Sequence, residues 1–247
     1  MTTPDRWTRT VREQLGLGRL LPLGGPLDGA WVAERAAREA LLAAVRNVPG
    51  VRPGRLRIAL AAPQETTEPV VPAPPSALPP GPLRVTADFA ASAAEPLPSA
   101  AARLRAALAE AATRRIGLTV TDVDLRATDL LDAAPEPVSG PGPEPAAGPS
   151  DGPAARAEAD DTDEGRAAGA ALAVPGVRGL TGTLGRPVHI TAPDAGREAA
   201  LPRRHVRVEL AVDADRPASE VALRVRAAVT ESLPDHPTVA VLVTEIG

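Results

Sequence analysis

The chain has 247 residues, a formal net charge of −4, no cysteine and only three aromatic residues, two Trp and one Phe. These numbers exclude disulfides, a thiol nucleophile and thiolate metal sites, and the net negative charge speaks against wholesale nucleic-acid binding. The 27 Leu, 23 Val, 4 Ile and 1 Phe make up about 22% of the residues, just above the level of about 20% below which chains stay disordered. We therefore expect a small, aliphatic core. All 27 basic residues are Arg, which is typical of a high-GC bacterium.

Residues 1–29 are predicted to form an amphipathic helix followed by an apolar loop over 20–26. Trp7, Val11 and Leu15 recur every four residues and would form one apolar stripe on the helix. We interpret this stripe as a candidate docking surface for a partner or an anionic membrane surface. The alternative is a helix that packs on its own domain.

Residues 30–131 are predicted to form a first α+β unit. Its apolar spacing predicts a helix over 30–47 that ends at a Val-Pro-Gly-Val motif. Further elements are expected in chain order: a strand over 55–60, a strand over 83–89, a helix over 98–115 and a strand over 118–125. Between the first two strands, residues 62–82 contain eight prolines. This insert is predicted to be extended and to lie outside the core.

Residues 132–163 are predicted to be a disordered linker, because they hold seven prolines and eight acidic residues and little apolar surface. Residues 164–247 then repeat the pattern of the first unit. The expected elements are a short helix to residue 173, strands over 188–191 and 205–212, a helix over 217–233 and a closing strand over 238–246.

The Val-Pro-Gly-Val motif occurs in both units, at 48–51 and 174–177, each time after an Ala-rich helix. The same order of elements follows each copy, which indicates a tandem duplication. We take Pro49, Gly50, Pro175 and Gly176 as structural markers of the repeat. The predicted fold class is α+β: two tandem two-layer sandwiches of helix–strand–strand–helix–strand, with a mainly antiparallel sheet and helices on one face.

A helix that ends in Val-Pro-Gly-Val and leads to a strand of the Val-Arg-Val-Glu-Leu-Ala-Val type (206–212) resembles the alkaline shock protein and Gls-type envelope stress response family. The likeness covers 164–247 best and 30–131 more loosely. It implies a non-enzymatic protein that associates with homologous proteins and with a membrane-anchored partner.

The whole chain, with its Arg-Trp-Thr opening and its Leu-Gly-Leu-Gly-Arg-Leu-Leu-Pro stretch, also resembles high-GC bacterial proteins labelled nucleopolyhedrovirus P-ten family. The viral protein is of a fibrous coiled-coil type, but no helix predicted here sustains three heptads. We therefore base the expected fold on the repeat.

The sequence contains few motifs that are typical of a catalytic, metal-binding or phosphate-binding site. His189 and His205 would come together if their strands pair, but a zinc site would need Asp213 or Glu209 as a third ligand. Glycine-rich stretches are present, yet a phosphate-binding P-loop is excluded because the chain has no lysine. We expect no catalytic residue, no cofactor and no metal ion.

Four aspartates, Asp122, Asp124, Asp129 and Asp132, follow one another at the end of the first unit. Carboxylates that alternate on a strand can share a cation, but no Gly-containing calcium loop accompanies them. We interpret them as a solvated strand edge.

These observations favour a scaffold or interaction protein of an envelope or alkaline stress response assembly, acting through homologous proteins, a homo-oligomer or a membrane-anchored partner. The expected location is cytoplasmic, with attachment at the membrane only through such a partner, because no apolar run spans a bilayer. A small RNA-binding module with Arg-lined strands is the alternative, which the net charge does not favour.

Overall fold

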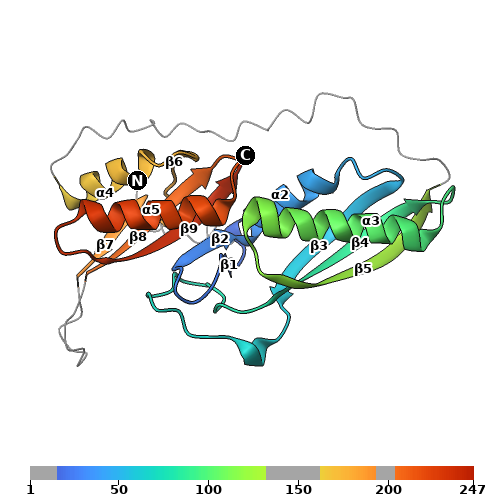
Figure 1. The fold of residues 1–247 in the computed structure, drawn as a ribbon, viewed down its shortest axis with the longest axis horizontal. Coiled ribbons are helices and arrows are strands. Elements are labelled where there is room, and N and C mark those ends of the chain that lie inside the picture. The colour runs from blue at the N-terminus through green and yellow to red at the C-terminus, as the bar shows by residue number, and fades with distance from the viewer. Residues whose placement is uncertain (1–15, 132–161, 193–203) are drawn as a thin grey trace, which may run out of the picture.

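The computed structural model describes residues 16–131, 162–192 and 204–247 and has an α+β fold (Figure 1). The predicted docking stripe of Trp7, Val11 and Leu15 lies outside the described residues. The same is true of the predicted linker except for its last two residues, Thr162 and Asp163. Thr162 caps a helix by accepting a hydrogen bond from Gly165 N on its side-chain oxygen.

The predicted repeat of elements is present in the structure. The first copy runs α2 (Glu34–Val45), β3 (Val51–Leu60), β4 (Leu83–Ser92), α3 (Leu97–Glu110) and β5 (Val120–Leu131). The second runs α4 (Asp163–Leu172), β6 (Val177–Leu180), β7 (Val188–Thr191), β8 (His205–Val212), α5 (Ala218–Ser232) and β9 (Thr238–Ile246).

The two copies also share one strand topology. In the first, β3 is antiparallel to β4 and β4 is parallel to β5. In the second, β6 and β7 are both antiparallel to β8, and β8 is parallel to β9. β6 and β7 together therefore replace the single strand β3. In each copy the parallel pair, β4–β5 or β8–β9, is joined by a helix, α3 or α5, as a parallel crossover requires.

Two predicted elements near the N-terminus are wrong. Leu20–Pro22, expected in a loop, forms β1, and Ala30–Ala33, expected as the first turn of a helix, forms β2. β1 and β2 pair antiparallel, and β2 then adds in parallel to β9. The resulting six-stranded sheet has the order β1-β2-β9-β8-β6, with β7 also on β8. The N-terminal residues thus complete the sheet of the second unit, while β3-β4-β5 form a separate sheet.

The Pro-rich insert was predicted to be extended and to lie outside the core; most of its residues are exposed or half-exposed, but part of it joins the core. Val71 is buried, and the backbone of the insert bonds to the N-terminal segment. Leu20 N donates to Ser76 O, and Leu78 N donates to Leu20 O. Prolines lack only their own N–H, so the insert still offers carbonyl groups and the N–H groups of its other residues to β1.

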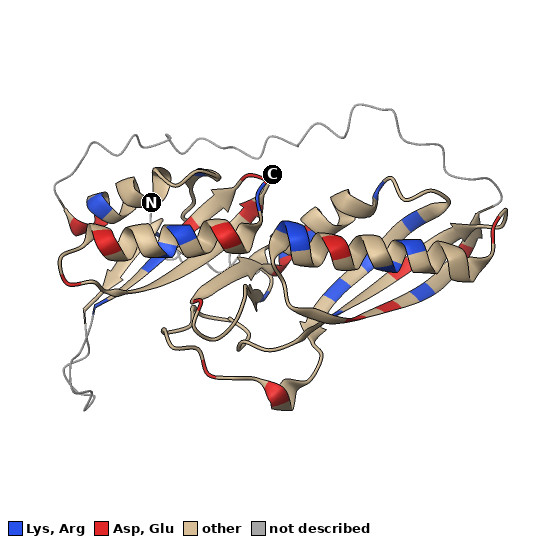
Figure 2. Cartoon of the chain, in the orientation of Figure 1, with Lys and Arg blue, Asp and Glu red and all other residues tan. Residues whose placement is uncertain are grey.

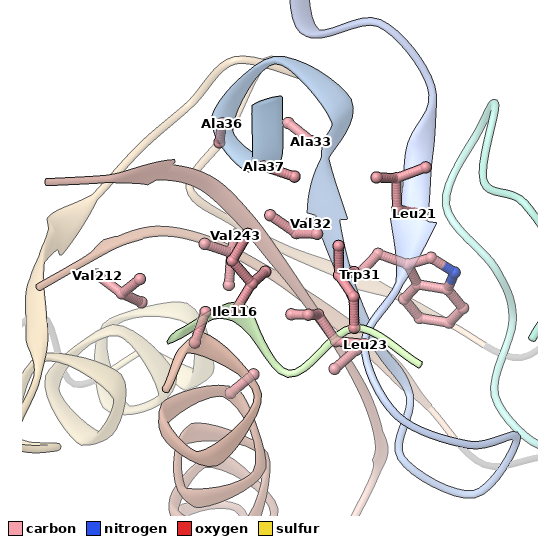
Figure 3. Close-up of a cluster of buried hydrophobic side chains, with 14 of the residues drawn as sticks. Leu21, Leu23, Trp31, Val32, Ala33, Ala36, Ala37, Ile116, Val212 and Val243 are labelled. Atoms are coloured by element: carbon pink, nitrogen blue, oxygen red, sulfur yellow. The ribbon is translucent and has the colours of Figure 1, made fainter. Parts of the chain in front are cut away.

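A continuous aliphatic core joins the two sheets. Ile116, which follows α3, lies in the same cluster of buried side chains as Val32 of β2 and Val243 of β9 (Figure 3). All three are 0% exposed. Helix α2 contributes Leu41 and Val45 to this core and touches both β3 and β9. No described helix is both long and apolar enough to cross a membrane.

Candidate functional site: the open edge and open face of the first sheet

Strand β9 has a covered edge. β2 pairs with it in register Ala30↔Val241, and Val241 N donates a 2.9 Å hydrogen bond to Gly29 O. Residues 239–244 of β9 are all buried. Their sequence, Val-Ala-Val-Leu-Val-Thr, is apolar on both faces of the strand, which is the pattern of a strand inside a sheet.

Strand β5 occupies the equivalent place in the other sheet, but no described strand pairs beyond it. Leu125 is opposite Ala87 of β4, as Val241 is opposite Val208 of β8. Arg105 Nε donates a 3.3 Å hydrogen bond to Val123 O, so the backbone of Val123 faces the edge. Because backbone groups alternate in direction along a strand, Leu125 also presents its N–H and C=O there.

Charged and apolar residues alternate along residues 122–127 of β5, and Figure 2 colours the charged ones. Arg84 of β4 lies 3.7 Å from Asp122 and 3.5 Å from Asp124. Asp129 lies 3.8 Å from Arg52, with its side chain 65% exposed. Asp122, Asp124 and Asp129 thus lie on a solvated strand edge, as the sequence predicts, and Asp132 lies outside the described residues. Arg126 has no ion pair with any residue that the structure describes.

At the opposite edge of this sheet, β3 borders a groove of about 620 Å³. Residues 16–19 and the first turns of α2 form its other walls. Five arginines and one glutamate line it: Arg19, Arg35, Arg38, Arg55, Arg57 and Glu34. Arg19 bridges the walls, because its Nε lies 3.2 Å from Glu34 Oε2 and its Nη2 donates to Ile58 O at 2.6 Å.

In the second sheet, the face that carries Glu209 is covered. Glu209 of β8 is 0% exposed under the segment that joins β6 to β7, where Leu184 N donates to its Oε2 at 2.9 Å. Arg207 Nη2 lies 3.3 Å from Glu209 Oε1, yet this oxygen and Arg207 Nε are buried without a hydrogen-bond partner among the described residues. Burial raises the pKa of Glu209, against the lowering effect of the Leu184 N–H and of Arg207.

The two histidines considered for a zinc site come from strands that do pair, with Thr191↔His205 and His189↔Arg207 in register. His205 Nδ1 lies 2.9 Å from Thr238 Oγ1, and burial lowers its pKa, with a further contribution from the positive charge of Arg207. Within residues 16–131, 162–192 and 204–247, no group of three or more His, Cys, Asp or Glu is placed to hold a metal ion.

The repeat markers occupy matching turns. Gly50 and Gly176 both have positive φ, 70° and 100°. Gly50 O accepts a hydrogen bond from Ser92 N, and Gly176 O accepts one from Asp213 N. The proline before each glycine starts the same turn, so Pro49 and Pro175 are structural positions, as the sequence indicates.

No family model matches this chain, and no curated protein or solved structure is significantly similar to it.

Sequence reasoning missed both the open edge and the groove. The exposure of β5 could be predicted in part, because charged and apolar residues alternate along it, whereas residues 239–244 of β9 are almost all apolar. The groove could not be predicted from the sequence. It brings Arg35 and Arg38 of α2 beside Arg55 and Arg57 of β3, and the sequence spacing does not give the geometry of the turn between these elements.

Proposed function

We propose that the protein is a non-enzymatic scaffold or interaction protein that associates with copies of itself, or with homologous units, through the free edge of β5. The supporting observation is the contrast between equivalent strands: β9 is closed by β2, and β5 is open. An open strand edge is a template for pairing with another chain. The resemblance to the alkaline shock proteins suggests an envelope or alkaline stress response assembly as the setting, with a membrane-anchored homologue as the other candidate partner.

The backbone and charges of β5 favour a particular register in a pair of copies. If two β5 strands pair antiparallel about a two-fold axis at Leu125, the outward N–H and C=O of this residue bond to those of its copy. Asp124 of each chain then lies opposite Arg126 of the other. Opposite charges at directly facing positions each contribute about 0.2–1 kcal/mol. The two-fold axis makes this pairing occur twice.

Sedimentation of the full chain from low to high micromolar concentration tests the proposal. We expect a reversible monomer–dimer equilibrium. Arg126→Glu and Asp124→Arg each place like charges opposite one another at both sites, so each should weaken dimerisation about tenfold or more. The double variant exchanges the charges and should restore it. Arg115→Glu, an exposed change outside β5, is the matched control.

A chain that stays monomeric at every concentration would contradict self-association. If the single variants weaken the dimer but the double variant does not restore it, the edge is involved and the Leu125 register is wrong. An effect of Arg115→Glu as large as that of Arg126→Glu would show a general effect of net charge.

A further inference from the structure

The groove between α2 and β3 concentrates positive charge in a chain whose net charge is −4. Arg19 and Glu34 neutralise one another across it. The remaining four arginines, Arg35, Arg38, Arg55 and Arg57, make no hydrogen bond or ion pair with any residue that the structure describes. All four are exposed, so water and salt screen their mutual repulsion, and a polyanion that enters the groove can pair with several of them at once.

The arrangement of the arginines follows from their spacing. Arg35 and Arg38 are three residues apart on α2 and so share one face of the helix. Arg55 and Arg57 are two residues apart on β3, and both line the groove from the strand side. A ligand in the groove therefore lies between two arginines of α2 and two of β3. Arg55 and Arg57 also line a hollow of the same sheet together with Asp88 and Asp124.

This feature is specific to the first unit. At the distance that separates the two Val-Pro-Gly-Val motifs, the counterpart of Arg38 is Glu164 of α4, which lies 3.7 Å from Arg186. The strand register makes His189 the counterpart of Arg57, since Leu56 and Val188 pair with the equivalent residues Ala87 and Val208. The basic groove has thus arisen, or been kept, in one copy of the repeat only.

The chemistry of the walls distinguishes between anions. Guanidinium groups bind phosphate and carboxylate oxygens in bidentate fashion. The oxygens of a phosphate point in several directions and can contact both walls at once, whereas the two oxygens of a carboxylate lie in one plane. Among the described residues, no aromatic side chain lines the groove, so this part of the chain offers no platform on which a nucleobase would stack.

The geometry points to a binding site for a soluble oligophosphate, a molecule with two or more linked phosphate groups, held between Arg35 and Arg38 on one wall and Arg55 and Arg57 on the other. The groove volume of about 620 Å³ has room for several phosphate groups. This site lies on β3, at the edge of the sheet opposite β5, so its occupation does not depend on self-association.

Isothermal titration calorimetry of the full chain with tripolyphosphate, at low and at physiological salt, tests this site. We expect one saturable site whose affinity falls as salt rises. Arg38→Ala with Arg57→Ala removes one guanidinium from each wall and should weaken binding about tenfold or more. The corresponding double Lys variant keeps the charge but loses the bidentate fork, and should bind between the two.

Arg114→Ala with Arg115→Ala is the matched control, because it removes the same charge from exposed positions of the π-helical turn Ala111–Ile116, outside the groove. It should bind within about twofold of the unmodified chain. Far-ultraviolet circular dichroism checks that each variant is folded.

Three results would overturn the inference. The first is the absence of tripolyphosphate binding at low salt. The second is equal weakening by the control pair, which would show a non-specific charge effect. The third is binding to single-stranded RNA or to vesicles of anionic phospholipid without binding to tripolyphosphate, which would assign the groove to a macromolecule or a membrane surface.

Discussion

The two closing strands, β5 and β9, occupy the same place in the repeat and differ in what lies beside them. β9 is flanked by β2 and β8 and is buried along almost its whole length. Among the described strands, β5 is paired with β4 alone, and it carries exposed charged residues. The same topology has thus been completed in one unit and left open in the other. In a duplicated protein, the open position is the place to look for a partner.

The outer faces of the sheets differ in the same way. Glu209 and Asp88 are equivalent, since each precedes by four residues the residue that bonds to the glycine of its Val-Pro-Gly-Val turn. Glu209 is 0% exposed and its pKa is raised by burial. Asp88 lines a surface hollow of the first sheet with Arg55 and Arg57. The segment that joins β6 to β7 thus buries Glu209, whereas Asp88 remains partly exposed in the first sheet.

The largest expected effect comes from removing Trp31, the residue of β2 that faces Leu242 of β9. Trp31 is 1% exposed and its Nε1 donates to Leu78 O at 3.3 Å. Trp31→Ala should lower the free energy of unfolding by about 3–5 kcal/mol, measured by urea denaturation. Leu125→Ala on the half-exposed edge of β5 should cost less than about 1 kcal/mol. Similar losses at both positions would contradict the difference between the edges.

Smaller losses are expected at the turns that mark the repeat. A Cβ on Gly176 would lie 2.7 Å from Arg216 Cδ and 2.9 Å from Val221 Cγ2. Gly176→Ala should therefore cost about 1–3 kcal/mol in unfolding free energy, from positive φ and from the contact with Val221. Gly185→Ala is the control, because its φ is 119° but nothing lies within 4 Å of its Cβ. A loss at Gly185 equal to that at Gly176 would assign the whole effect to the backbone.

The pH dependence of stability should distinguish the covered face of the second sheet, which holds Glu209, from the open face of the first sheet, which holds Asp88. Burial raises the pKa of Glu209, so the unfolded chain releases this proton at lower pH than the folded chain does. Stability therefore falls as the pH rises from the ordinary value of 4.5 toward the raised pKa of the folded state. Glu209→Gln should abolish this fall in denaturation curves collected between acid and neutral pH.

His205 contributes with the opposite sign. Burial lowers its pKa, so stability is lost as the pH falls below the ordinary value of 6.5. The Glu209→Gln variant should keep this loss.

Asp88→Asn on the open face should change stability by no more than about 0.5 kcal/mol. If Glu209→Gln leaves the pH profile unchanged, the carboxyl is not held in a buried environment.

Much of the fold could be predicted from the sequence, because hydrophobic periodicity and the repeated motif report local structure directly. β7, β8 and β9 begin and end at the residues that the sequence predicts. β1 and β2 were missed because Leu20-Leu21-Pro22 and Ala30-Trp31-Val32-Ala33 are too short to show a period, and only the distant β9 makes them strands. The burial of Val71 in the Pro-rich insert was also not predicted, because it too depends on contacts with a distant segment.

The candidate site shows the same limit. Charged residues on β5 were evident as a solvated edge, but what makes that edge open is the absence of a neighbour in the described sheet, which depends on where β2 goes. Sequence spacing likewise places Arg35 with Arg38 and Arg55 with Arg57. Only the packing of α2 beside β3 brings the two pairs to one groove.

Amide hydrogen exchange of the full chain at low and high protein concentration tests the central claim most directly, because it compares β5 and β9 in one sample. At low concentration, the amides of Val123 and Leu125 should exchange quickly, whereas Val241, bonded to Gly29, should exchange slowly. At high concentration, protection should rise at Leu125 and stay unchanged at Val241. Protection at Leu125 that does not change with concentration would contradict association through the β5 edge.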